Sequence, residues 1–354
     1  MNLYPKLITD ALSSVRYPGT GKNIIEAGML DDDMRIDGMR VSFSLIFPKN
    51  PDPFMKSVVR AAEAAIKTQV GQEVEVEITA LAPDLAPKQQ EGKLLPEVKH
   101  VIAVSSGKGG VGKSTIAANL AVALARKGYK VGLLDADVLG PSLPTMFHVA
   151  DYAPYSELVG DRQMIVPAEK YGVKLMSIGF FVKPNQATVW RGPMASNALK
   201  QLISECNWGD LDYFILDTPP GTGDIHLTLL QSLEVTGAII VSTPQKVALA
   251  DARKGIDMYM NEKINVPILG LVENMAWFTP KELPENRYYI FGKDGVKNLA
   301  EEMGVPLLGE IPLVQGICES GDTGEPAAVN PNTLTGQAFD GLADNVVKRL
   351  GESL

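Results

Sequence analysis

The chain has 354 residues, of which 45% are hydrophobic and 21% are charged, proportions typical of a globular protein with a sizeable core. Its formal net charge is −9 and its pI is near 5.0, which disfavours general binding to nucleic acid or to an anionic membrane surface. Two cysteines exclude a disulfide framework, so we expect a reducing, cytoplasmic setting with no nucleic-acid partner and no membrane partner.

A chain of this length suggests two domains, and residues 1–82 predict a small α/β domain. The hydrophobic spacing indicates helices over 5–14 and 54–66, and the alternation of apolar and polar residues indicates strands over 41–47 and 74–78. No set of residues in this part has the chemistry to run a reaction. We therefore interpret it as an interaction or regulatory module.

Proline and polar residues predict a linker over 83–98. From residue 99 onward, apolar strands alternate with helical patterns, which predicts a mostly parallel, doubly wound sheet covered on both faces, in a domain over 99–354. The predicted strands are Val101–Val104, Lys130–Asp135, Val173–Ile178, Tyr213–Asp217, Ala238–Ser242 and Ile268–Glu273. Ligands of such sheets bind at the carboxyl ends of the strands, so motifs at these ends are the candidate site residues.

The segment GKGGVGKST, residues 107–115, fits the phosphate-binding loop pattern, because it follows the first strand and opens a helical pattern. Its glycines let the backbone approach a phosphate where any Cβ would collide, and the helix N-terminus favours negative charge. Lys113 would contact the β and γ phosphates, and the Ser114 hydroxyl would bind Mg²⁺. The predicted nucleotide-binding residues here are Gly107, Lys108, Gly109, Gly110, Val111, Gly112, Lys113, Ser114 and Thr115. The alternative, a glycine-rich turn without a ligand, does not explain why every position of the pattern is filled.

Two aspartates, Asp135 and Asp137, stand at the end of the strand over 130–135. Asp135 would lie near the water shell of the metal and hold Mg²⁺ through water. Asp137 lies farther along the loop and is the candidate that positions or deprotonates the attacking water. The alternative is that both side chains only cap a turn.

The segment YFILDTPPGTGD, residues 213–224, repeats this arrangement, with Asp217 at the end of an apolar strand. An aspartate at this place is the usual Mg²⁺ partner, through water, in phosphate-loop NTPases. The N–H groups of Gly221 and Gly223 can meet a γ phosphate, so the loop can order with nucleotide and relax after hydrolysis. Asp224 is either a further contact or the N-cap of the following helix, and we favour the cap.

Four motifs resemble those of the Mrp/ApbC-type ATPases, in the same order along the chain: GKGGVGKST with its additional Lys108, DADVLGPS at 135–142, WRGPM at 190–194 and LDTPPGTGD at 216–224. That family belongs to the deviant phosphate-loop ATPases, together with MinD, ParA and the nitrogenase iron protein. The resemblance covers nearly all of the second domain and implies Mg²⁺-dependent ATP hydrolysis. The first domain resembles a diverged copy of the small iron–sulfur assembly domain that often precedes such ATPases.

The resemblance also implies a homodimer that sandwiches two ATP molecules, in which the lysine matched by Lys108 reaches the partner's phosphates. A second cation there would offset charge on the transferred phosphoryl group. By the same resemblance Asn274, in GLVENM, reads the adenine base. The candidate catalytic residues are therefore Lys108, Lys113, Asp137 and Asp217.

Members of this family are expected to deliver an iron–sulfur cluster to apoproteins from a CxxC motif shortly after the ENM segment. Here Pro280 and Leu283 take the places of the two cysteines, and neither side chain can ligate iron. Cys206 and Cys318 are 112 residues apart, and a buried thiol is the default for each. We find no iron–sulfur ligands, and we expect an ATPase switch in cluster assembly or transfer that does not use the usual ligands. Its partners would be iron–sulfur apoproteins or assembly factors.

Two other functions stay open: a positioning switch like MinD or ParA, and a scaffold whose shape nucleotide sets. MinD-type proteins bind membrane through a basic amphipathic C-terminal helix. Here the apolar residues at helical spacing over 339–350 are accompanied by Asp340 and Asp344 as well as Lys348 and Arg349, so a basic excess is lacking. We therefore expect this helix to dock on the core of its own chain.

Overall fold

The computed structural model describes residues 3–31, 33–48, 52–81, 94–95, 97–138, 140–181, 192–262, 264–280, 282–283 and 285–351. The chain folds into two compact units, Met1–Glu91 and Gly92–Leu354. Most of the linker expected over 83–98 lies outside the described residues, as do the first two residues of WRGPM. Each unit has a hydrophobic core of its own.

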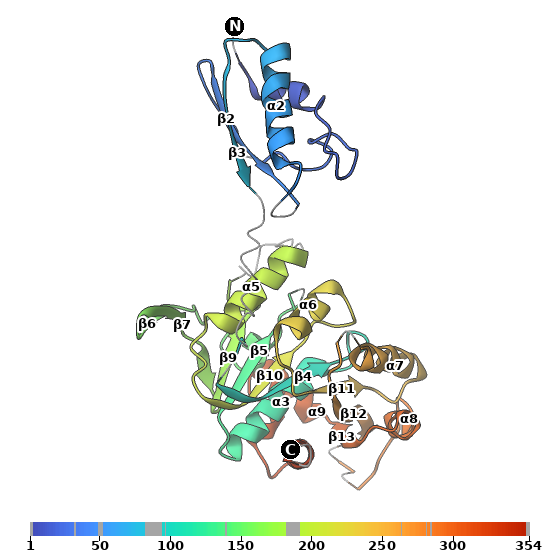
Figure 1. The fold of residues 1–354 in the computed structure, drawn as a ribbon. Helices are drawn as coiled ribbons and strands as arrows, with labels where there is room; N and C mark the ends of the chain where they lie inside the picture. The colour runs from blue at the N-terminus through green and yellow to red at the C-terminus, as the bar shows by residue number, and fades with distance from the viewer. Residues whose placement is uncertain are drawn as a thin grey trace. The chain divides into compact units, whose positions relative to one another are not determined.

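The N-terminal unit is a three-stranded sheet with a helix lying along it (Figure 1). Strand β2 (Arg40–Ile46) pairs in antiparallel with β1 (Arg35–Asp37) and in parallel with β3 (Glu75–Leu81). The parallel pair needs a crossover, which α2 (Met55–Gln69) supplies, and α2 also packs against α1 (Pro5–Leu12). The core side chains include Ile8, Leu12, Phe43, Leu45, Val58, Ala62 and Ile66. Both predicted helices and both predicted strands are confirmed.

The second unit is built on an eight-stranded sheet (Figure 1). From one edge to the other, the strands are β13 (Leu307–Leu313), β12 (Ile268–Phe278), β11 (Gly237–Ser242), β4 (Val98–Ser105), β10 (Leu211–Asp217), β5 (Val131–Asp135), β9 (Val173–Ser177) and β8 (Ala168–Lys170). All neighbouring pairs are parallel except the last, in which β8 runs antiparallel to β9. The mostly parallel sheet and its six predicted strands are confirmed, and β8 and β13 are additional.

Helices cover both faces of this sheet, so the unit has two cores. One core contains side chains of α3 (Lys113–Arg126) and α10 (Leu334–Gly351). The other contains side chains of α5 (Gly192–Ser204), α6 (Asp224–Ser232), α7 (Lys246–Met260) and α8 (Gly295–Met303). Two shorter helices, α4 (Leu143–Met146) and α9 (Gln315–Thr323), contact each other. On β4, Ile102 and Val104 face the first core, whereas Val101 and Ala103 face the second, as strand alternation requires.

The C-terminal helix α10 docks on the core of its own unit, as predicted. Its buried side chains include Phe339, Leu342, Ala343, Val346 and Leu350. Arg126 and Lys127, at the end of α3, pair with Asp340 and Asp344 of α10 at 2.9 and 2.7 Å. The apolar face of α10 is therefore used inside the unit. Across the described part of the chain, no helix combines the length and the apolar character that crossing a bilayer requires.

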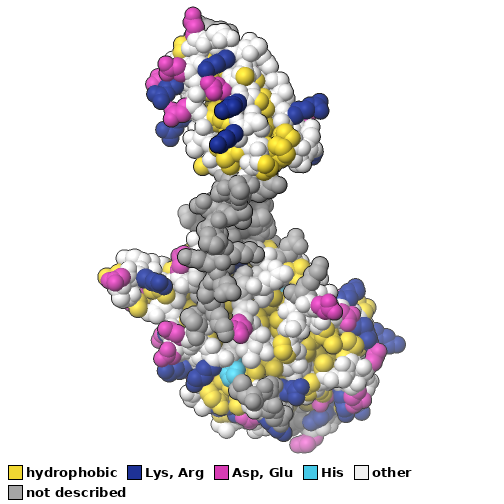
Figure 2. Space-filling view, in the orientation of Figure 1, with side chains coloured by type: hydrophobic (Ala, Val, Ile, Leu, Met, Phe, Trp, Pro, Cys, Tyr) yellow, Lys and Arg dark blue, Asp and Glu magenta, His cyan; other side chains and the backbone are white. Residues whose placement is uncertain are grey.

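A two-stranded hairpin, β6 (Ser156–Val159) and β7 (Arg162–Ile165), extends away from the main sheet (Figure 1). It exposes 68% of Leu158 and 42% of Val159. The sequence pattern did not predict it, because most of its residues are exposed on both faces and no alternation marks the strands. On the face shown in Figure 2, acidic and basic side chains of this unit are mixed rather than separated into areas of one sign.

Candidate functional site

The loop over 106–112 turns sharply between β4 and α3. Gly110 and Gly112 have φ values of 80° and 83°, in the left-handed region that favours glycine. At Gly109 and Gly110 a Cβ would meet no atom within 4 Å, so the loop backbone is open to a ligand there. Helix α3 begins directly after the loop at Lys113 and has no side-chain cap at its start. Its free first-turn N–H groups therefore suit an anion.

The other two glycines of the loop are required by packing within the protein. A Cβ on Gly107 would lie 2.1 Å from the backbone carbonyl of Asp251 in α7. A Cβ on Gly112 would lie 2.2 Å from the Nδ2 atom of Asn274 in β12. The phosphate-loop pattern alone explains every glycine of the loop by clearance for a phosphate. The structure adds a second reason for these two, because α7 and β12 press directly against the loop.

Asn274 holds the nucleotide loop from the side of β12. Its side chain is 5% exposed, and its Nδ2 atom donates a hydrogen bond of 2.8 Å to the Val111 carbonyl oxygen. The next residue, Met275, has a φ of 54°, and the register between β12 and β13 shifts after Asn274, as at a β-bulge. The predicted contact of Asn274 with adenine stays a prediction.

Lys113 lies in a buried polar cluster beneath the loop. It is 6% exposed, and its ammonium lies 2.5 Å from Oδ1 of the fully buried Asp217 and 3.3 Å from the Ser114 hydroxyl. Three predicted site residues from two elements are thus in contact. Lys108 and Thr115 are half-buried in the loop and in the first turn of α3.

Two aspartates at the carboxyl ends of adjacent strands form the acidic part of this cluster. Asp135 of β5 is paired in register with Asp217 of β10, and both are fully buried. Burial, and then the charge of Asp217, raises the pKa of Asp135, whereas the contact with Lys113 opposes the rise that burial causes in the pKa of Asp217. The Oδ2 atom of Asp217 has no hydrogen-bond partner among the described residues. A hydrated Mg²⁺ would supply the missing partner and the missing positive charge, so the residues fit this cation.

The loop after β5 is organised by the carboxylate of Asp135. Its two oxygens accept hydrogen bonds from the N–H groups of Asp137 and Leu143, each at 3.2 Å, and from the Ser177 hydroxyl at 3.1 Å. Asp137 is half-buried and accepts a bond of 3.2 Å from the N–H of Gly140. Both aspartates therefore stabilise a turn in this structure, in agreement with the alternative that the sequence leaves open. Their roles towards Mg²⁺ and water stay predictions.

The loop over 217–224 is docked on the nucleotide loop. The N–H and hydroxyl groups of Thr218 donate to the Val104 carbonyl oxygen at 3.1 and 3.0 Å. Gly221 donates its N–H to the Ser106 carbonyl oxygen at 3.2 Å. The predicted N-cap is wrong by one residue: Gly223 takes the N-cap position, and α6 already includes Asp224.

The place of the expected cysteine pair is a loop that backbone hydrogen bonds close at its base. The backbone groups of Phe278 and Tyr288 exchange hydrogen bonds of 2.8 and 2.9 Å, and Leu283 between them is 50% exposed. Within the described ranges, no group of three or more His, Cys, Asp or Glu side chains could hold a metal ion.

Neither cysteine of the chain lies at that loop. Cys206 precedes β10 and therefore lies near the amino ends of the strands, at the opposite edge of the sheet from the nucleotide loop. It is buried, and burial raises the pKa of its thiol to about 12. The side chain of Cys318 lies outside the described residues.

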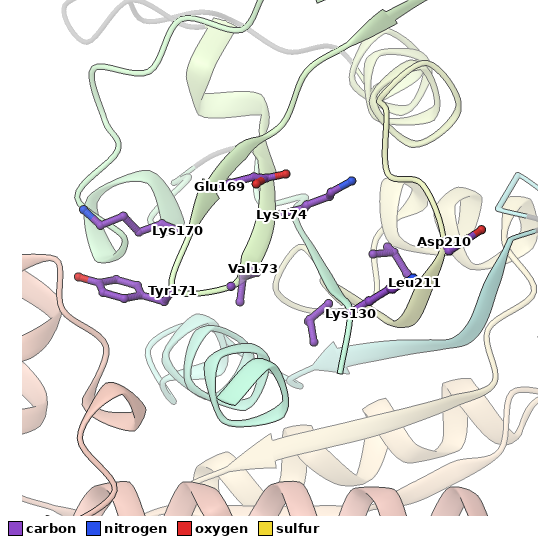
Figure 3. A pocket seen from close by; sticks show the side chains of 10 residues that line it. Lys130, Glu169, Lys170, Tyr171, Val173, Lys174, Asp210 and Leu211 are labelled. Atoms are coloured by element: carbon purple, nitrogen blue, oxygen red, sulfur yellow. The ribbon is translucent and has the colours of Figure 1, made fainter. Parts of the chain in front are cut away.

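A pocket of about 600 Å³ lies at that opposite edge (Figure 3). Its lining includes Lys130 before β5, Val173 at the start of β9 and Leu211 at the start of β10. Because these residues mark the amino ends of parallel strands, the pocket is separate from the cluster around Lys113.

Two family descriptions match the two units of the chain. Residues 97–347 match the ParA family described as the NUBPL iron-transfer P-loop NTPase. Residues 6–78 match the family described as an iron–sulfur cluster assembly protein.

Proteins that are similar to this chain in sequence or in structure carry names that agree with these family matches. The iron–sulfur cluster carrier protein of Synechocystis sp. is 43% identical, over 97% of this chain and 98% of its own length. The mitochondrial iron–sulfur protein required for NADH dehydrogenase of Arabidopsis thaliana is 51% identical, over 72% of this chain and 80% of its own length. The solved nucleotide-binding protein of Archaeoglobus fulgidus, in complex with ADP, is 36% identical with a TM-score of 0.59, and the match covers 68% of this chain and 94% of that one.

Proposed function

Because this chain belongs to the NUBPL iron-transfer family of P-loop NTPases, we propose that it is a Mg²⁺-dependent ATPase that serves iron–sulfur cluster assembly or transfer to apoproteins. The observation that carries this proposal is the buried contact of Lys113 with Asp217 and Ser114 beneath an open glycine loop. The proposed role in cluster assembly or transfer is supported by relatives that are named as iron–sulfur cluster carriers. One of these relatives matches nearly the full length of this chain.

The nucleotide loop would hold the phosphates through backbone groups. Gly109 and Gly110 leave room for a close approach, and the uncapped first turn of α3 supplies N–H donors. Lys113 is the first residue of that helix and contacts Asp217 in the structure. When nucleotide binds, its ammonium would move from Asp217 to the phosphate oxygens. Lys108 would supply a second cation to the partner's phosphates in a homodimer.

Mg²⁺, when bound, would neutralise charge on the phosphoryl oxygens. The Ser114 hydroxyl would hold it directly, and Asp217 and Asp135 would hold it through water. Asp137 would orient the attacking water and accept its proton.

The 217–224 loop would act as the switch of this ATPase. In the structure the N–H of Gly221 is bonded to Ser106 at 3.2 Å, and a γ phosphate would compete for this donor. The loop would therefore have two alternative partners, one with and one without the γ phosphate.

The cluster, as cargo, would not be held at the loop over 279–287 by this chain, because Pro280 and Leu283 replace the thiolates. The chain would instead act on cluster delivery through its nucleotide cycle and its partners. A membrane-positioning role like that of MinD is disfavoured, because the apolar face of α10 is buried in its own unit.

Lys113→Ala tests the ATPase. We expect it to abolish binding of a fluorescent ATP analogue and all ATP turnover, because the phosphates lose their buried cation. Lys127→Ala is the matched control at the other end of α3, where the side chain pairs with Asp344 on the surface, and it should behave as wild type. Unchanged nucleotide affinity in Lys113→Ala would exclude the loop as the binding site.

A further inference from the structure

A buried histidine and a buried tyrosine connect the 217–224 loop to helix α7. His226, in the first turn of α6, is 1% exposed, and Tyr259, near the end of α7, is fully buried. The Nε2 atom of His226 lies 2.9 Å from the Tyr259 hydroxyl, and its Nδ1 atom lies 3.3 Å from the Pro219 carbonyl oxygen. Both ring nitrogens thus have a partner, and the two partners belong to different elements.

The hydrogen-bond directions follow from the carbonyl end of this connection. A carbonyl oxygen only accepts, so Nδ1 of His226 carries the proton and donates to Pro219. Nε2 is then an acceptor, and the Tyr259 hydroxyl donates to it. Burial lowers the pKa of His226 to about 4, so at neutral pH the ring is neutral and this tautomer is maintained.

Both ends of the connection are fixed to the nucleotide loop. On one side, Gly221 of the 217–224 loop donates its N–H to Ser106. On the other side, α7 packs so closely on Gly107 that a Cβ there would lie 2.1 Å from the Asp251 backbone. The 217–224 loop therefore contacts the nucleotide loop directly through Gly221, and indirectly through His226, Tyr259 and the tightly packed helix α7.

We propose that His226 is a positioning residue for ATP hydrolysis, which together with Tyr259 fixes the backbone at Pro219 and so holds the start of the 217–224 loop in place while Gly221 exchanges Ser106 for the γ phosphate. The kinetic part of this inference rests on the proposed ATPase function. His226 acts through the loop backbone and touches no nucleotide. Burying an imidazole has a desolvation cost that a leucine would avoid, and the two hydrogen bonds offset that cost while they fix the loop.

Tyr259→Phe is the smallest change that tests this role, because it removes one oxygen and keeps the ring. We expect kcat for ATP to fall by about tenfold, as for the loss of one buried hydrogen bond, with KM unchanged within about twofold. A change in KM alone would overturn the inference, because a positioning residue for the chemical step acts on kcat.

A double-mutant cycle tests whether the two side chains act as one connection. His226→Leu should lower kcat at least as much as Tyr259→Phe, and the double variant should be no slower than His226→Leu, because the connection is already broken. Losses that multiply in the double variant would show two independent effects and would contradict the proposal.

Amide hydrogen exchange supplies a readout that does not need turnover. In the nucleotide-free protein, Tyr259→Phe should increase exchange in the peptide over 218–223, where Gly221 is bonded to Ser106. Tyr152→Phe is the matched control, because it removes a hydroxyl bonded at 3.0 Å to the Val166 carbonyl oxygen away from this loop, and it should leave this peptide unchanged. Exchange at the wild-type rate in Tyr259→Phe overturns the inference. If the wild-type protein shows no ATP turnover, the proposed ATPase function is refuted. The exchange experiment still tests whether His226 and Tyr259 hold the 217–224 loop, because it does not depend on turnover.

Discussion

Asp137 has two uses in the proposed site, and each needs a different property of its side chain. In the structure its Oδ1 atom accepts the N–H of Gly140 at 3.2 Å, a turn contact that any side-chain oxygen of this length can make. Action on the attacking water needs the negative charge and basicity of the carboxylate. A neutral side chain of the same shape separates the two.

Asp137→Ala is expected to retain nucleotide binding and to lose ATP hydrolysis. Asp137→Asn keeps an oxygen for Gly140 but removes the charge, so it should be as inactive as the alanine variant. Steady-state ATP turnover and the affinity for an ATP analogue provide the measurements. An active asparagine variant would assign Asp137 to the turn and would show that another group positions the water.

Single residues were the least predictable part of the site. The motif spacing predicts Lys113, Ser114 and Asp217 as site residues from the sequence, and the structure brings the three into contact. His226 stood out only as one of three scattered histidines. Its partner Tyr259 lies 33 positions away, and only the folding of both residues into the same core brings the two together.

At the scale of secondary-structure elements, the nucleotide loop is compressed between α7 and β12. Gly107 and Gly112 make room for these neighbours, whereas Gly109 and Gly110 face open space. Two glycines of one motif therefore serve the fold, and two are available for the ligand.

Alanine substitutions should distinguish these two kinds of glycine. Gly107→Ala places a Cβ against the backbone of α7, so we expect a lower unfolding temperature together with weaker nucleotide binding. Gly109→Ala meets no protein atom within 4 Å, so its unfolding temperature should equal that of wild type while nucleotide affinity falls. Thermal unfolding and analogue titration check both. Wild-type affinity in Gly109→Ala would show that the phosphates do not approach the loop there.

Strands with a clear pattern of apolar residues could be predicted from the sequence, and strands without such a pattern could not. The six central strands consist mainly of buried apolar residues, which the sequence shows directly. Strand β13 carries Pro312 and Gly309, which weaken a strand pattern, yet it lies at the sheet edge, where a missing N–H is tolerated. Strand β12 continues past its predicted end at Glu273 to Phe278, through the irregular backbone at Met275.

At the scale of the whole molecule, the predicted site residues lie where the strands of the large sheet end, at their carboxyl ends. The cluster around Lys113 lies at the carboxyl ends of β4, β5 and β10. Cys206 and the pocket of Figure 3 lie at the amino ends. An iron–sulfur cluster bound through Cys206 would therefore lie at the opposite ends of the strands from the nucleotide. The burial of Cys206 and the raised pKa of its thiol also disfavour a thiolate there.

Anaerobic reconstitution with iron and sulfide tests the absence of a resident cluster. We expect wild-type protein to retain no stoichiometric iron after desalting and to show no cluster absorbance in the visible range. The variant Cys206→Ser/Cys318→Ser should give the same result. A stable cluster in wild type that this variant loses would identify unusual ligands in this chain and would contradict the expectation.

The loop closed by Phe278 and Tyr288 differs from a cysteine-containing loop in its sensitivity to oxidation. Its sequence contains no cysteine, so it presents neither a thiolate that peroxide can oxidise nor iron that oxygen can strip away. A pair of cysteines at this place would be open to oxidation of its thiolates. In this chain the proposed nucleotide cycle would continue under such conditions, because none of its site residues is a cysteine.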